Sequence, residues 1–297
     1  MEGFEEGAAT AERHARPAPH RLRAHVVKYV GYRLRSVPPQ RRLSVPAATV
    51  TLFLGWGEPL RVVGPSERQR DAEDWWAMAV GLHSRAMTSE ISGTAHGVQV
   101  EFTPLGAYCL LGLPLRHLAD RVVHPDEIMG RRWVVRLTER LAATPDWAGR
   151  CALLDEAIAA RLADGRRPSP VVMEAWQRLR ATGGRASIGE LAEATGRSRR
   201  RLEILFGEQI GLPPKVLARV LRFQNAVTLP PVPGRSLAET AALCGYYDQA
   251  HFNREFRALT GLTPTRFGRL SATLPEPAHG RLTSVLTSPP VRGRPAR

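Results

Sequence analysis

Two short segments of this 297-residue chain carry side chains that can read the edges of DNA bases. The first, RRRLEI, supplies arginines, a glutamate and an isoleucine, and the second, QAHFNR, supplies amides and an arginine. Arginine can donate two hydrogen bonds to guanine, glutamate can accept one from cytosine, amides can pair with adenine, and an apolar side chain can contact the thymine methyl group. The candidate DNA-contacting residues are Arg199, Arg200, Arg201, Glu203, Ile204, Gln249, Ala250, His251, Asn253 and Arg254.

The elements that must position these side chains are two copies of an internal repeat, over residues 187–214 and 236–264. Each copy begins with an S-x-x-E capping box, and a glycine follows nine residues after the serine. A phenylalanine comes later, with a glycine five and a proline eight residues after it. Each copy predicts a helix, a tight turn closed by a left-handed glycine, and a second helix. The paired positions are Ser187 and Ser236, Glu190 and Glu239, Gly196 and Gly245, Phe206 and Phe256, Gly211 and Gly261, and Pro214 and Pro264.

The second helix of each copy has a predicted cap and a predicted buried face. Ser198 caps this helix in the first copy and Asp248 caps it in the second. Apolar residues at helical spacing lie opposite the polar set and are expected in the core. This helix-turn-helix pattern places its second helix in the DNA major groove. The predicted core residues are Leu202, Leu205, Phe206, Phe252 and Phe256.

Residues 213–227 predict a stiff helix that joins the two copies, because their apolar side chains also have helical spacing. Two second helices held in one chain can reach successive major-groove segments about 34 Å apart. Arg222 on the joining helix is predicted either to bind a phosphate or to brace the two halves. His251 is predicted either to reach a phosphate or to pack against the turn.

Residues 171–270 resemble the DNA-binding domain of the AraC family of bacterial transcription regulators. The resemblance is carried by Gly245, by DQAHFNREF (248–256) and by TGLTPTRF (260–267). It implies that Arg200, Glu203 and Ile204 face the bases in the first copy, although family members often have a basic or polar residue where this chain has Ile204. It also implies a sensor or dimerisation domain elsewhere in the chain. The N-terminal part is similar to the β-rich sensor regions of actinobacterial members.

The charge distribution agrees with an acidic partner. The net charge is +14, and 17 basic against 8 acidic residues within 166–270 give this segment +9. Such a concentration of positive charge is typical of modules that bind nucleic acid. The three cysteines, Cys109, Cys151 and Cys244, are far apart in apolar surroundings, so a disulfide framework is not expected and a buried apolar role is.

The composition predicts an α+β chain. We expect a disordered tail over 1–20 and a β-rich barrel or sandwich over 21–128, which includes the apolar segment AYCLLGL. A helical linker should cover 129–167, with helices at 131–143 and 147–163, followed by the all-α DNA-binding domain at 168–270 and a disordered basic tail at 271–297.

These features predict a sequence-specific transcription regulator, controlled by a ligand or partner at its N-terminal domain, with no catalytic residues, metal or cofactor. Double-stranded DNA is the main predicted partner, and RNA polymerase, a small-molecule effector and a second copy of the chain are candidates. No membrane segment is expected, and a cytoplasmic location follows. The alternative is a DNA-binding domain fused to an alkyl-transfer or repair-like enzyme, or to a purely protein-interacting domain. The apolar surroundings of Cys109 disfavour the enzyme.

Overall fold

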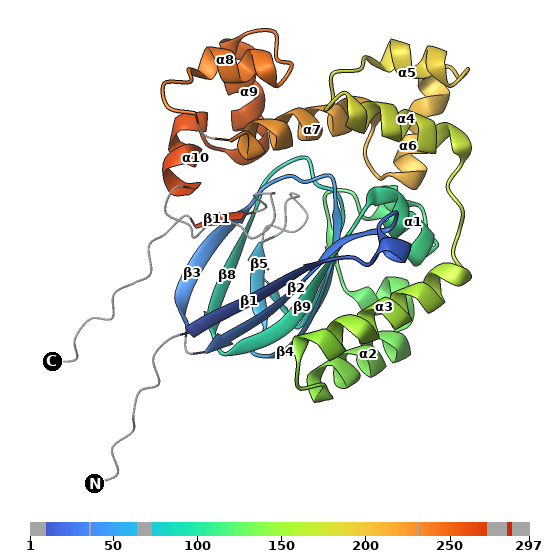
Figure 1. The fold of residues 1–297 in the computed structure, drawn as a ribbon, viewed down its shortest axis with the longest axis vertical. Helices are drawn as coiled ribbons and strands as arrows, with labels where there is room; N and C mark the ends of the chain where they lie inside the picture. Colours follow the sequence, from blue (N-terminus) through green and yellow to red (C-terminus); the bar gives the residue numbers. More distant parts are fainter. Residues whose placement is uncertain (1–9, 36, 64–72, 231, 272–283, 287–297) are drawn as a thin grey trace, which may run out of the picture.

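The computed structural model describes residues 10–35, 37–63, 73–230, 232–271 and 284–286. Antiparallel strands dominate the first part of the chain, and helices make up the C-terminal part (Figure 1). The predicted α+β class is therefore confirmed. Among the described helices, none combines the length and the apolar character that a membrane span requires.

The strands form two antiparallel sheets, of six strands in the order β1-β2-β9-β4-β7-β10 and of five in the order β11-β3-β8-β5-β6. Figure 1 shows β3, β8 and β5 of the second sheet beside the strands of the first. The strands are β1 (Thr10–Pro17), β2 (Val26–Arg35), β3 (Val37–Ser44), β4 (Val50–Gly57), β5 (Leu60–Val63), β6 (Glu73–Trp75), β7 (Ala77–Val80), β8 (Met87–Gly93), β9 (Ala95–Phe102), β10 (Val122–Val123) and β11 (Ser284–Leu286).

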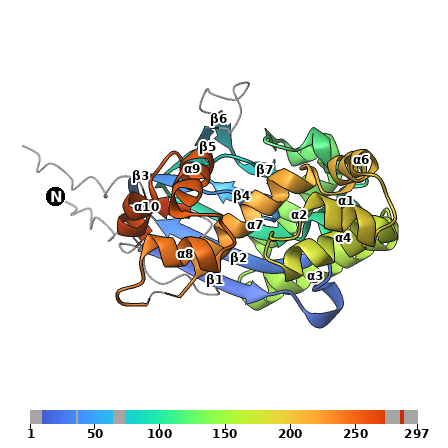
Figure 2. The ribbon, with the colours of Figure 1, turned by 90° about the horizontal axis from the view of Figure 1, so that it is seen from above.

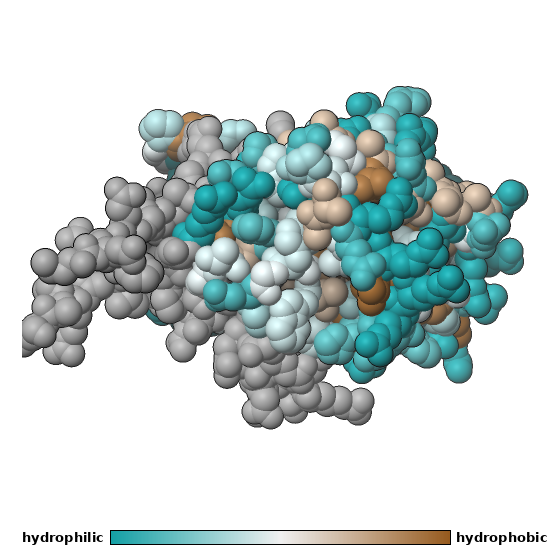
Figure 3. Space-filling view, turned by 90° about the horizontal axis from the view of Figure 1, so that it is seen from below, coloured by the Kyte–Doolittle hydropathy of each residue, from teal (hydrophilic) through white to brown (hydrophobic). Residues whose placement is uncertain are grey.

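In the described part of the chain, three helices and three short helical turns accompany the larger sheet. They are η1 (His20–Leu22), α1 (Pro104–Leu111), η3 (Leu115–His117), the π-helical turn η4 (Asp126–Gly130), α2 (Arg131–Ala143) and α3 (Trp147–Ala163). The helices predicted at 131–143 and 147–163 are confirmed as α2 and α3. At Gly31 on β2 a side chain would collide with the Trp147 ring of α3, so the missing side chain lets the helix lie close against the sheet. The underside of the molecule is mainly hydrophilic, with scattered hydrophobic residues (Figure 3).

A buried polar cluster fastens α3 to the first two strands. The Tyr29 hydroxyl donates a hydrogen bond to Asp155 Oδ1 at 2.6 Å, and Arg16 lies 3.1 Å from Asp155 Oδ2. Tyr29 and Asp155 are both buried, so this carboxylate depends on its two protein partners. Burial, followed by the hydrogen bond to Asp155, raises the pKa of the Tyr29 hydroxyl, so it remains a donor over the physiological range.

Tyr29→Phe should lower the free energy of unfolding by about 1.5–3 kcal/mol, because it leaves one oxygen of a buried carboxylate without its donor. Urea denaturation of the full chain measures the change. Tyr32→Phe on the same strand is the matched control, because the Tyr32 hydroxyl makes no hydrogen bond to the described residues. Equal losses in the two variants would show that the bond to Asp155 contributes little.

The C-terminal helices form two groups, which we call the first and second units, and α7 joins them, as seen from above in Figure 2. α5 and α6 lie near one end of α7, and α8, α9 and α10 lie near the other. The helices are α4 (Pro170–Ala181), α5 (Ile188–Ala194), α6 (Arg199–Gln209), α7 (Pro214–Thr228), α8 (Leu237–Leu243), α9 (Gln249–Thr260) and α10 (Pro264–Ser271).

The first of these units shares one hydrophobic core with the β-rich region. That core runs from Val100 in β9 through Leu154 in α3 to Phe206 in α6 and Leu217 in α7. The second unit has a separate core around Phe223, Phe252, Phe256 and Phe267. Val45, from the loop after β3, is buried in this second core, so the β-rich region contacts both units.

Two hydrogen bonds donated by backbone amides reinforce this contact. The Ala48 amide donates to the Gln224 side chain on α7 at 3.1 Å. The Ala86 amide donates to the Leu259 carbonyl at the end of α9 at 2.7 Å. These two bonds fix the C-terminal end of α7 and the end of α9 to the β-rich region, and the shared core around Leu217 fixes the other end of α7.

Both predicted tails contain strands, which corrects two boundaries. Residues 10–17 of the predicted 1–20 tail form β1, which pairs with β2 along its whole length, while residues 1–9 lie outside the described part. In the predicted 271–297 tail, Ser284–Leu286 form β11 on the edge of β3, and 272–283 and 287–297 lie outside it. Each segment gains backbone hydrogen bonds by pairing with the edge of a sheet.

The segment AYCLLGL was expected among the strands, and this is wrong because it belongs to α1 and its C-cap. Thr103 accepts a hydrogen bond from the Gly106 amide at 2.9 Å, Pro104 occupies the first helical position, and Gly112 ends the helix with φ of 68°. These are the start and stop features of a helix. All the described positions of α1 except Leu105 are buried, which explains the lack of polar periodicity.

Candidate nucleic-acid interface

α5 and α6 form the first helix-turn-helix unit. The Ser187 hydroxyl accepts from the Glu190 amide at 3.1 Å, and the Glu190 carboxylate accepts from the Ser187 amide at 2.6 Å. Gly196 closes the turn with φ of 60°, where a side chain would be disfavoured. Ser198 then caps α6 by accepting from the Arg201 amide at 3.3 Å. The predicted capping box, turn and cap are all present.

α6 has one buried and one exposed face. Leu202, Leu205 and Phe206 are buried, as predicted. Ile204 is apolar but 50% exposed, and it lies in the middle of the polar face. The predicted contact residues on this face are all exposed: Arg199, Arg200, Arg201, Glu203 and Ile204.

α8 and α9 repeat this construction. The Ser236 amide donates to the Glu239 carboxylate at 2.7 Å, and the Glu239 amide donates to the Ser236 hydroxyl at 3.1 Å. The bonds to Ser236 lower the pKa of the Glu239 carboxyl, so the box stays charged. Gly245 has φ of 78°, and Asp248 caps α9 by accepting from the His251 amide at 2.6 Å.

The outward side of α9 presents the second predicted set. Gln249, Ala250 and Arg254 are exposed, whereas Asn253 is half-buried. The Asn253 side-chain oxygen is buried and has no hydrogen-bond partner among the described residues. Phe252 and Phe256 fill the opposite face, and their rings meet edge to face with centroids 5.5 Å apart.

A cluster around Glu255 joins α7 to α9. Arg219 and Arg222 of α7 lie 3.0 and 3.1 Å from the Glu255 carboxylate. Arg222 also donates to the Gly184 carbonyl at 2.9 Å, so it links the loop after α4 with α9. These contacts correspond to the bracing role predicted for Arg222, and its contact with a DNA phosphate stays a prediction.

His251 packs against the turn, which was also one of two predicted alternatives. Its Nδ1 accepts from the Tyr247 amide at 3.3 Å, its Nε2 lies 3.4 Å from Glu255, and its ring is edge-on to Tyr246. These contacts use both ring nitrogens inside the protein and leave the neighbouring Gln249 and Arg254 free to face outward.

Sequence reasoning missed three residues that bear on this surface. The ion pair between Arg219 and Glu255 holds α7 against α9. The sequence signal for Glu255 was its position one helical turn after His251, which it contacts. Tyr247 is 93% exposed directly before the cap of α9, and Leu243 at the end of α8 is 58% exposed. An aromatic residue in a polar turn was the sequence signal for Tyr247.

α7 spaces the two units, and it is anchored in both cores. Leu217 and Leu221 belong to the core shared with the β-rich region, whereas Val220 and Phe223 belong to the core of the second unit. The predicted connecting helix is therefore confirmed, within one residue at each end. Rotation of one unit relative to the other requires α7 to leave one of its cores.

The three cysteines are not disposed for nucleophilic chemistry. Cys109 and Cys244 are buried, and Cys151, predicted to be buried too, is only partly so. Burial raises the pKa of all three thiols, which favours the less reactive protonated form.

Comparison with known proteins places the repeat in a defined family of domains. A family model described as a helix-turn-helix domain matches residues 191–269. "Probable transcriptional regulator LumQ" of Photobacterium leiognathi is 31% identical over 81 residues, which make up 27% of this chain and 33% of LumQ. This chain therefore spans about a third of the length of that relative.

Solved structures resemble the chain at low identity. ToxT from Vibrio cholerae matches with a TM-score of 0.45 and 10% identity, over 86% of this chain and 97% of ToxT. The C-terminal domain of AraT, a response regulator from Geobacillus stearothermophilus, matches with a TM-score of 0.33 and 23% identity, over 38% of this chain and 98% of that domain. Together with the repeat, the family match identifies residues 191–269 as a helix-turn-helix domain of the AraC type.

Proposed function

We propose that this protein is a sequence-specific regulator of transcription that reads two adjacent major-groove segments of DNA. The observation that carries the proposal is the pair of exposed polar faces, on α6 and α9, joined by a helix that is anchored in two cores. Each second helix of a helix-turn-helix unit enters the major groove, and successive groove segments are about 34 Å apart.

The two faces carry different recognition chemistry. Arg200 and Glu203 on α6 suit guanine and cytosine, and Ile204 suits a thymine methyl group. Gln249 and Asn253 on α9 suit adenine. The remaining exposed arginines, among them Arg199, Arg201 and Arg254, supply phosphate or base contacts.

The test is capture of genomic DNA fragments by the purified full chain, followed by sequencing. We expect an enriched motif of two half-sites about one helical turn apart. Retention of fragments without a shared motif would mean that the protein binds only the DNA backbone, and the sequence-specific function would be rejected.

Gln249→Ala should relax base preference in one half-site and weaken binding to the selected sequence by about 1–3 kcal/mol, because it removes a bidentate contact to adenine. Competition binding with duplexes altered at each position measures this. Gln177→Ala is the matched control, since Gln177 is an exposed glutamine on α4, outside the two helices α6 and α9 that are proposed to read the bases. An unchanged motif in Gln249→Ala would show that another side chain of α9 faces that base.

Control of this activity belongs to the β-rich region in our proposal. A ligand or protein partner that binds one arrangement of the two regions better than another shifts the population that binds DNA or recruits polymerase. The continuous core and the bonds from Ala48 and Ala86 supply a physical path for such coupling.

A further inference from the structure

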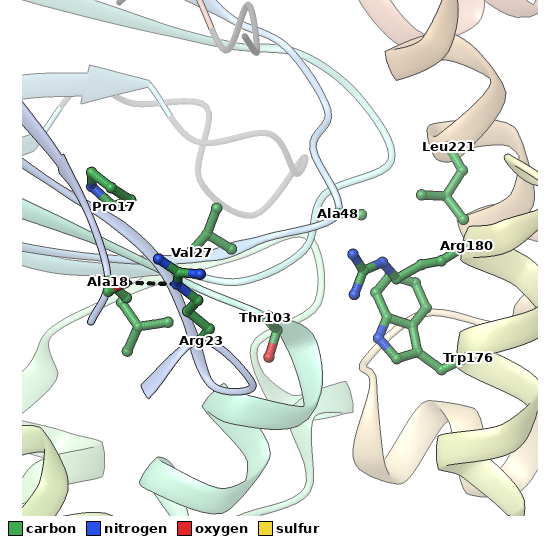
Figure 4. A pocket seen from close by; sticks show the side chains of 10 residues that line it. Pro17, Ala18, Arg23, Val27, Ala48, Thr103, Trp176, Arg180 and Leu221 are labelled. Atoms are coloured by element: carbon green, nitrogen blue, oxygen red, sulfur yellow. Dashed lines mark hydrogen bonds between the residues drawn. The ribbon is translucent and has the colours of Figure 1, made fainter. Parts of the chain in front are cut away.

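A cavity of about 250 Å³ lies where the β-rich region meets the C-terminal helices (Figure 4). Ala18 and Val26, at the facing ends of β1 and β2, form one wall. Trp176 of α4 and Leu221 of α7 form the other. All four of these side chains are buried, so the cavity has a firm apolar lining supplied by both parts of the chain.

Two arginines stand on opposite walls of this cavity. Arg23 follows η1, and Arg180 extends from the last turn of α4 towards the β-rich region (Figure 4). The ten described lining residues include these two cations and no acidic residue. No carboxylate of a described residue lies within 4 Å of either guanidinium, so both charges lack an ionic partner in this part of the chain.

Both arginine side chains are exposed, and most of their hydrogen-bond donors have no partner among the described residues. Arg23 Nε donates a hydrogen bond to the Ala18 carbonyl at 3.3 Å. The guanidinium carbon of Arg180 lies 5.6 Å from the centroid of the Trp176 ring. The other polar side chain, Thr103, donates to the Ala24 carbonyl at 2.9 Å and accepts from the Gly106 amide. The cavity therefore offers spare donors and positive charge, and a ligand must bring the acceptors and the negative charge.

The size of the cavity limits the ligand. Its volume equals that of about eight water molecules in the liquid and is slightly below the range for drug-sized ligands. A carboxylate on a single ring or a short chain would place its charge between the arginines and its apolar body against Val26, Trp176 and Leu221.

From this geometry we infer that the cavity binds a small organic carboxylate, held between Arg23 of the β-rich region and Arg180 of the helical region. Its regulatory meaning rests on the proposed function, but the binding itself does not. A carboxylate that bridges the two arginines binds only when both walls are in place, so it stabilises the docked arrangement.

The test is calorimetric titration of the full chain with benzoate, phenylacetate and hexanoate. We expect at least one of them to bind with a Kd on the order of 1 mM, as suits ligands of this size. Benzamide keeps the ring without the charge, and inorganic phosphate keeps a charge without the apolar body. Both should bind about tenfold more weakly or not at all.

Arg23→Met and Arg180→Met keep the apolar stems and remove the charges. Each should weaken carboxylate binding by about tenfold or more. Arg21→Met and Arg178→Met are the matched controls, since these exposed arginines lie two residues away and outside the cavity. The site is rejected if none of the three carboxylates binds, or if all four variants bind them as the parent does.

The carboxylate titration and the DNA capture together distinguish failure of this site from failure of the proposed function. If a carboxylate binds but no DNA motif is captured, the site stands and the regulatory function falls. If DNA binds with sequence specificity and no carboxylate does, the reverse holds. If both bind, the carboxylate must change the Kd for the selected duplex by the same factor as the duplex changes the Kd for the carboxylate. A factor of one would reject the coupling.

Discussion

Phe256→Ala is expected to destabilise the second helix-turn-helix unit by about 3–5 kcal/mol. The Phe256 ring is 2% exposed and meets the rings of Phe223, Phe252 and Phe267 at centroid distances of 5.0, 5.5 and 5.3 Å. Alanine removes the side chain on which this small core is built, and the rings around it belong to three different helices.

Urea denaturation followed by circular dichroism measures this loss, and duplexes that carry one half-site show which unit has failed. We expect the half-site read by α9 to be lost first, because the core around Phe206 is separate. Leu243→Ala is the control, since this leucine of the same unit is 58% exposed and should change stability by less than about 0.5 kcal/mol. A loss in Phe256→Ala as small as in Leu243→Ala would mean that the second core contributes little to folding.

Raising the salt concentration from about 50 to 200 mM should weaken binding to the selected duplex by about 10³–10⁵-fold, if six to ten phosphates are neutralised. Each arginine that contacts a phosphate releases a condensed counterion, so log K falls linearly with log salt. The exposed arginines in and around the two units make this number of contacts available: Arg197, Arg199, Arg200, Arg201, Arg254, Arg257, Arg266 and Arg269.

Fluorescence anisotropy over a salt series measures the slope for the selected duplex and for a scrambled one. The scrambled duplex should lose affinity with a slope that is also steep, because phosphate contacts carry no sequence information. A shallow slope with the selected duplex would indicate that few arginines reach the backbone, and the placement of DNA across α6 and α9 would then be wrong.

The helix-turn-helix units were predictable because their signals are local. The capping boxes at Ser187 and Ser236, and the glycine turns at Gly196 and Gly245, depend on residues within one or two turns of helix. Because the same spacing occurs twice in the chain, each copy supports the helix boundaries predicted for the other. The same locality explains why α2, α3 and α7 were found with accurate ends.

The strands β1 and β11 and the helix α1 were missed for different reasons. TAERHARP in β1 is mostly polar and becomes a strand through pairing with β2, a contact that no local pattern encodes. In α1, a short apolar run does not distinguish a strand from a buried helix by periodicity. The decisive residues were at its ends, where Thr103, Pro104 and Gly112 mark the start and the stop.

The candidate contact residues were predictable as a set, but their partners inside the protein were not. Nothing within one turn of Arg222 indicates that it reaches both Gly184 and Glu255, because those residues come from other elements. No local pattern predicts the cavity between Arg23 and Arg180, because its lining residues come from positions between 17 and 221 in the sequence. Such sites arise only when the two regions dock.

The anchoring of α7 in two cores makes the protein sensitive to the phase of the DNA helix. One extra base pair between half-sites displaces the second by about 3.4 Å and turns it by about 34°. α7 cannot follow this turn without withdrawing Leu217 and Leu221 or Val220 and Phe223 from their cores. The duplex must deform instead, at a cost of about 1–6 kcal/mol, or one half-site is released. The interval between half-sites is thus recognised along with their sequences, and two correct half-sites at the wrong interval are read as one.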